Sequence, residues 1–85
     1  MEKRIGTALI MVENTDFVQQ MNEIAFRHSK IIIGRLGLPR SNGQNIISLL
    51  LEGTTDEIGS LTGQLGRLKG IQVKSVLLKN HNNDE

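Results

Sequence analysis

Hydrophobic positions follow two different periods along the chain, and the change from one period to the other predicts its elements. Residues 4–13, RIGTALIMVE, are rich in apolar and β-branched side chains, and this run is too short to suggest a lone helix. After the capping triplet NTD, the segment up to about residue 29 shows helical spacing, with an apolar stripe formed by Phe17, Met21, Ile24 and Ala25. A strand followed by an amphipathic helix is therefore predicted.

The second half of the chain continues this alternation. The stretches KIIIGRLGL and NIISLLLE are predicted as strands, and the loop between them makes them a hairpin. Thr54 and Glu57 have the spacing of a capping box, so a second helix is expected to start there and to end near Gly70. Its apolar stripe consists of Ile58, Leu61, Leu65 and Leu68. IQVKSVLLK is the fourth predicted strand.

The order strand, helix, strand, strand, helix, strand predicts an α+β fold of the ferredoxin-like βαββαβ type, to which ACT-like domains belong. Four antiparallel strands would form the sheet, with both helices on one face. We expect a single domain over residues 1–79 and a disordered polar tail over residues 80–85. The first three strands carry large apolar side chains on both faces, so a homo-oligomer, either a dimer or a tetramer, is expected to cover the second face or its edge. A monomer with scattered surface leucines is the alternative.

Composition narrows the function classes. With 85 residues, two phenylalanines and no tryptophan or tyrosine, the chain can form only a small, aliphatic core. The lack of cysteine excludes disulfides, thiolate catalysis, iron–sulfur clusters and cysteine-based zinc sites, and we expect no metal and no cofactor. Apolar runs of about four residues are far shorter than the roughly 20 of a membrane helix, so a cytoplasmic protein is expected. The net charge of +1 gives no electrostatic case for direct nucleic-acid binding.

No catalytic motif can be assembled from the spacing of the polar residues. No serine lies in a nucleophile-elbow pattern, and the junction of the first strand and first helix is acidic where an acylphosphatase-like enzyme needs an arginine. Aromatic side chains that could stack on RNA bases are missing from the predicted strands. We therefore predict that the chain is not an enzyme. His28 is expected to bond a free carbonyl at the end of the first helix.

Two segments are candidates for ligand binding. Asn14, Thr15 and Asp16 precede the first helix, where free backbone N–H groups suit a small polar ligand, although an ordinary helix cap is the alternative. Arg35 belongs to the second strand, and simple alternation places it on one face with Ile31 and Ile33. A charge in that position calls for a carboxylate, an anionic ligand or a contact between subunits, unless a bend in the strand rotates Arg35 into solvent.

The stretch GRLGLPRSNGQN around Arg35 otherwise has the composition of a strand that bends and then turns. Gly34 and Gly37 permit a bend or bulge, Leu38 and Pro39 end the pairing, and SNG supplies the turn.

The second predicted helix also carries glycines on the face away from its apolar stripe. Gly59, Gly63 and Gly66 share this face, and each interior glycine costs about 0.5–1 kcal/mol relative to alanine. A partner backbone that approaches the helix would explain them, and so would a flexible surface helix. Phe26 lies off the apolar stripe of the first helix, which makes it a further candidate for an interface.

The motifs GRLGLP and EGTTDEIGSLTGQLGRLKG, with the strand VKS that follows, resemble the family of iron-only hydrogenase system regulators. These are small stand-alone ACT-like proteins, and the resemblance extends over nearly the whole chain. It implies a ferredoxin-like fold, an oligomer and a role in regulating hydrogenase expression, as a transcriptional regulator, or hydrogenase maturation. The family offers no catalytic residues or settled ligand site to carry over. Two functions stay open: a small-metabolite sensor, and an interaction module that binds a hydrogenase-system protein.

Overall fold

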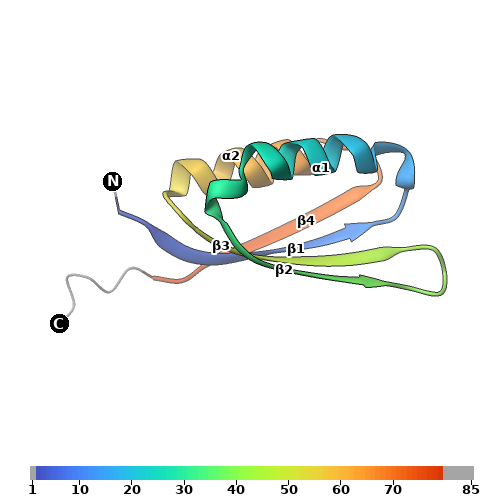
Figure 1. The fold of residues 1–85 in the computed structure, drawn as a ribbon, viewed down its shortest axis with the longest axis horizontal. Coiled ribbons are helices and arrows are strands. Elements are labelled where there is room, and N and C mark those ends of the chain that lie inside the picture. The colour runs from blue at the N-terminus through green and yellow to red at the C-terminus, as the bar shows by residue number, and fades with distance from the viewer. Residues whose placement is uncertain (1, 80–85) are drawn as a thin grey trace.

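The chain folds in the order predicted from its hydrophobic pattern (Figure 1). The structure is a computed structural model and describes residues 2–79, so the tail expected at residues 80–85 lies outside the described residues. The elements are β1 (Arg4–Val12), the 3-10 helix η1 (Thr15–Phe17), α1 (Val18–Arg27), the 3-10 helix η2 (Ser29–Ile31), β2 (Ile32–Pro39), β3 (Asn45–Gly53), α2 (Thr55–Gly66) and β4 (Ile71–Leu77).

The four strands form one sheet in the order β2-β3-β1-β4, and every neighbouring pair is antiparallel. Figure 1 shows α1 and α2 side by side on one face of this sheet. The predicted ferredoxin-like α+β fold is therefore confirmed. Because β1 lies between β3 and β4, the two central strands are β1 and β3, and β2 and β4 are the edges.

The core lies between the helices and the helix-facing side of the sheet. Alternate residues of the central strands point into the core, and the apolar stripes of both helices pack against them. Each large aliphatic side chain that is fully buried contributes about 1.5–3 kcal/mol. The largest fully buried side chains are Ile10, Leu49, Leu51, Leu61, Leu65 and Val12.

The predicted capping box fixes the start of α2. The backbone N–H of Thr54 donates to Glu57 Oε1 at 2.8 Å, and the backbone N–H of Glu57 donates to Thr54 Oγ1 at 3.1 Å. The bond from the Thr54 backbone N–H is the main reason why the pKa of Glu57 lies below its usual range. After α2 the chain turns at Gly70, whose φ of 78° is the left-handed conformation expected there.

A bulge in β2 changes which side of the sheet its residues face. The pairing with β3 shifts between Ile32 and Gly34, so Arg35 lies opposite Leu49, on the helix-facing side. Ile33 is the extra residue at this shift and has no partner in β3, so the simple alternation that grouped Arg35 with Ile33 on one strand face does not hold. Ile31, the other residue of that group, is buried in η2 before the strand begins. The bend or bulge expected at Gly34 is confirmed.

Candidate functional site

A groove runs between α1 and the edge strand β2, on the helix-facing side of the sheet. Although they face the helix layer, Arg35, Gly37 and Pro39 of β2 are exposed, so α1 does not cover this side of the strand. One hollow of about 340 Å³ lies here. Its apolar lining comes mainly from β1, α1 and the hairpin: Val12, Val18, Met21, Pro39 and Ile47. We call this feature the α1–β2 groove.

The groove continues toward the C-terminal end of α1 as a second hollow of about 360 Å³. Both hollows are lined by Asn22 and Arg35, which therefore stand at the middle of the groove. The same two residues line a void of about 10 Å³ together with the buried Leu49 and Leu65, which places them at the boundary of the core. Within residues 2–79, Arg35 makes no hydrogen bond or ion pair, so its guanidinium donors are available to a ligand.

The chemistry of the groove suits a small organic anion. The planar guanidinium of Arg35 can donate two parallel hydrogen bonds to a carboxylate or phosphate group. The side-chain amide of Asn22 adds a donor and an acceptor, and the apolar lining accommodates the rest of the molecule. Each hollow falls within the volume of about 300–1,000 Å³ that is typical of small-molecule sites.

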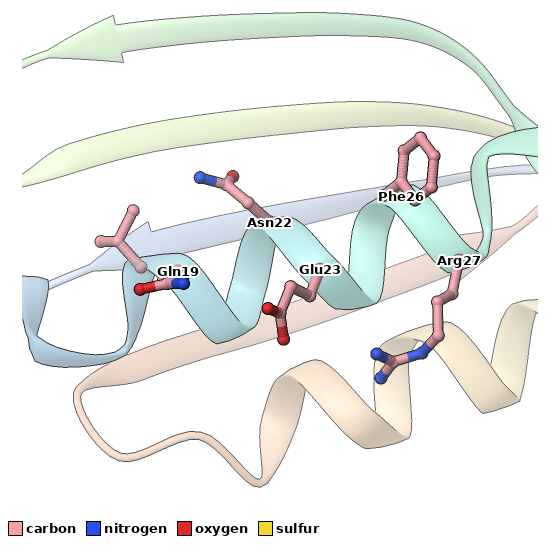
Figure 2. A pocket seen from close by; sticks show the side chains of 6 residues that line it. Gln19, Asn22, Glu23, Phe26 and Arg27 are labelled. Atoms are coloured by element: carbon pink, nitrogen blue, oxygen red, sulfur yellow. The ribbon is translucent and has the colours of Figure 1, made fainter.

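The outer surface of α1 borders the groove (Figure 2). A shallow hollow of about 600 Å³ covers this surface, and Figure 2 shows that Asn22 and Phe26 point toward the strands while Glu23 and Arg27 point toward α2. Arg27 reaches α2, because its Nη2 donates to Gln64 Oε1 at 3.3 Å. Phe26 is 78% exposed, in agreement with its predicted position off the core stripe. Its role at an interface stays a prediction.

The segment before α1 does not reach the groove. The backbone N–H of Asp16 donates to Asn14 Oδ1 at 2.8 Å, so Asn14 is the N-cap of η1, and the backbone N–H of Asn14 donates to the Gly70 carbonyl at 3.3 Å. Asn14, Thr15 and Asp16 are not among the residues that line the two hollows at Arg35. The structure thus shows the helix cap, and ligand binding by this segment stays a prediction separate from Arg35.

The glycines of α2 face away from the core, as predicted. Ile58, Leu61 and Leu65 are buried on one side of the helix, whereas Gly59, Gly63 and Gly66 are exposed on another. A Cβ atom added at any of these three glycines would meet nothing within 4 Å beyond the backbone of its own helix and its chain neighbours. A partner therefore has access to the backbone of this face, and its use as an interface stays a prediction.

His28 links the C-terminal end of α1 to the middle of α2. Its Nδ1–H donates to the Ile24 carbonyl at 2.8 Å, which confirms the predicted bond to a carbonyl at the end of α1. With Nδ1 protonated, Nε2 of the neutral ring accepts from the Ser60 hydroxyl at 3.0 Å, and Ser60 Oγ accepts from Gln64 Nε2 at 3.0 Å. Sequence reasoning missed the link to Ser60, because nothing local to either helix indicates which turns lie side by side.

Residues 2–79 contain no group of three or more histidine or acidic side chains placed to hold a metal ion. None of the helices in this range is long and apolar enough to cross a bilayer.

The fold and the groove define a small ACT-like domain, and comparison with known proteins identifies its family. Residues 4–75 match the model of the TM1266-like family, which is described as a family of iron-only hydrogenase system regulators. The chain belongs to this family. It is similar to the uncharacterized protein TM1266 from Thermotoga maritima, with 38% identity and a TM-score of 0.86 over 92% of this chain and 100% of that one. No curated protein matches the chain.

More distant structures share the fold alone. The ACT domain from GTP pyrophosphokinase of Chlorobium tepidum has 18% identity and a TM-score of 0.69, over 87% of this chain and 99% of that one. The nitrogen regulatory PII-like protein CPII from Thiomonas intermedia K12, solved with ADP, AMP and bicarbonate, has 11% identity and a TM-score of 0.50, over 91% and 92%. The expected ACT-like architecture is thus shown by independent structures.

Proposed function

We propose that this protein is a regulator in the iron-only hydrogenase system and that it acts as an oligomeric, small-molecule-sensing ACT-like domain. The family supports the link to the hydrogenase system, and it is described as a family of regulators rather than of enzymes. The single observation that carries the sensing role is Arg35, an arginine without a partner among residues 2–79 that stands beside Asn22 in an open, largely apolar groove.

The ligand that this groove favours is a small organic anion with an apolar part. Its acidic group would accept hydrogen bonds from Arg35, and its apolar part would contact side chains such as Val18 and Ile47. Such a ligand would touch both α1 and β2, and it would therefore stabilise the position of the helix on the edge strand. Anions also bind the PII-like fold in CPII, which was solved with nucleotides and bicarbonate. Asn14, Thr15 and Asp16 are a second candidate segment for ligand contact.

Thermal melting tests the sensing role. The wild-type chain is melted with a panel of amino acids, nucleotides and iron-related metabolites, since a ligand that binds only the folded state raises the midpoint, by about 2.7 kcal/mol of stability at a hundredfold excess over Kd. Arg35→Gln should lose most of the shift. Arg40→Gln is the matched control, because Arg40 lies in the exposed turn after β2 and does not line the groove.

The alternative function is a protein-interaction module without a small ligand, which binds a protein of the hydrogenase system. Two observations favour it: the 78% exposure of Phe26, and the accessible backbone of α2 at Gly59, Gly63 and Gly66. A complete lack of midpoint shifts across the panel would contradict the sensor and support this module. Capture of purified hydrogenase-system proteins by the wild-type chain, weakened by Phe26→Ser, would then establish it.

A further inference from the structure

The side of the sheet opposite the helices, which we call the open face, carries exposed apolar side chains from every strand. Within residues 2–79, no helix covers this face (Figure 1). The strand register places on it Ile5, Thr7, Leu9 and Met11 of β1, Ile46, Ser48 and Leu50 of β3, Leu36 and Leu38 of β2, and Val76 of β4. Five of these side chains are about half exposed or more: Leu9 55%, Leu36 59%, Leu38 52%, Leu50 46% and Val76 63%.

The bulge in β2 adds two of these leucines to the open face. Because the register shifts between Ile32 and Gly34, Leu36 lies opposite Ser48 and Leu38 lies opposite Ile46. Without the extra residue, simple alternation from Ile32 would direct both leucines into the α1–β2 groove. The bulge therefore places Arg35 on the groove side of the sheet and the two leucines on the open face.

The polar groups of the open face are compatible with packing against a second copy of the same chain. The Thr7 hydroxyl donates to the Leu49 carbonyl at 2.9 Å, so it needs no partner from outside. The charges that the register places among the apolar residues are Glu52, opposite Ile5, and Lys74, opposite Leu9. A second acid, Glu13, follows β1, and its Oε2 accepts from Nε2 of Gln72, opposite Met11, at 2.9 Å. A face that carries both signs of charge can pair acid with base across a twofold axis, whereas a strongly charged partner would be repelled by some of these groups.

The size of the open face is also that of a dimer interface. Four strands about 4.8 Å apart, each contributing about eight residues at about 3.4 Å, give roughly 500 Å² in projection. Protruding side chains increase this area toward the roughly 800 Å² that each partner buries in a stable complex. Contiguous apolar patches of more than a few hundred Å² rarely stay exposed on monomers.

We propose that a second copy of the chain packs on the open face, sheet against sheet, about 10 Å apart and related by a twofold axis. This proposal deepens the oligomeric part of the proposed function and rests on it. The two helix layers would lie outside, and both α1–β2 grooves would stay open to ligand because each lies on the other side of its sheet.

Sedimentation velocity over a broad range of concentrations tests the interface on the full chain. The wild type should form a dimer, or a larger even-numbered oligomer that contains it. Leu9→Glu puts a charge in the middle of the apolar patch and should weaken association at least about 100-fold. The matched control is Phe26→Glu, which introduces the same charge at an exposed apolar residue on the helix side and should leave association unchanged.

Val76→Glu on β4 serves as a second variant, and far-UV circular dichroism establishes that each variant is folded. If Leu9→Glu does not fold, the effect of Val76→Glu on association decides whether the open face is the interface. A monomeric wild type, an assembly that both sheet variants leave intact, or dissociation by Phe26→Glu alone would overturn the proposal. The sensing role is judged separately, because a monomer whose melting midpoint rises with a panel ligand would disprove the interface and keep the sensor.

Discussion

Alanine substitutions in the glycine face of α2 should make the isolated chain more stable. Gly59 and Gly63 lie inside the helix, are exposed, and leave open space where a Cβ atom would lie. Alanine gains about 0.5–1 kcal/mol at each position, because it loses less backbone entropy than glycine on folding and meets no neighbour. The double variant should therefore gain about 1–2 kcal/mol.

The same chemical change at Gly70 should have the opposite effect. Gly70 has a φ of 78°, and a Cβ atom there would collide with the side chain of Asn14. The left-handed conformation alone costs a residue with a Cβ atom about 1–2 kcal/mol, and the collision adds to that cost. Gly70→Ala should therefore lose at least this amount, which makes it a matched control for the substitutions in α2.

Urea unfolding followed by circular dichroism measures these differences, since the chain has no tryptophan or tyrosine for fluorescence. With a slope of about 1–3 kcal/mol/M, the midpoint of the double variant should rise by roughly 0.3–2 M. All variants are compared at one protein concentration, and sedimentation is expected to show unchanged self-assembly. A lower midpoint or a loss of assembly after Gly63→Ala would refute the reasoning and show that another backbone contacts this face.

Four further substitutions test the core, the helix cap and the link between the helices. Leu61→Ala should lower the free energy of unfolding by about 2–5 kcal/mol in urea titrations, since the side chain is fully buried. The lowered pKa of Glu57 means that its stabilising effect is present above the ordinary glutamate pKa and is lost as the pH falls through the lowered value, so Glu57→Gln should flatten the acid part of a stability–pH curve. His28→Ala should cost about 1 kcal/mol in thermal melts, and Ser60→Ala should cost less, because the Ile24 carbonyl keeps its bond.

The elements of the fold could be predicted because their signals are local. The capping box depends on two residues three positions apart, Thr54 and Glu57, and both of its bonds are present. Gly70 adopts the left-handed conformation that its place after the second helix predicted. Apolar periodicity likewise placed Leu61 and Leu65 in the core. Features of this kind need only the sequence of one turn or one helix.

The candidate site depends on relations between distant segments, which one sequence does not contain. The side on which Arg35 lies is decided by the position of the bulge, and a glycine at residue 34 permits a bulge without fixing its register. The groove exists because α1 leaves the edge strand uncovered, which no pattern within either element indicates. The pairing of His28 with Ser60 similarly requires knowing how the helices pack.

The central claim, a small-anion sensor at the α1–β2 groove, is tested most directly by two-dimensional ¹H–¹⁵N NMR of the full chain. The wild-type protein is titrated with the same panel of amino acids, nucleotides and iron-related metabolites. We expect at least one compound to cause saturable shifts centred on the amides of Asn22, Arg35 and Gly37. Unchanged spectra across the panel, or shifts centred on Asn14 to Asp16 or on the glycines of α2, would contradict the account.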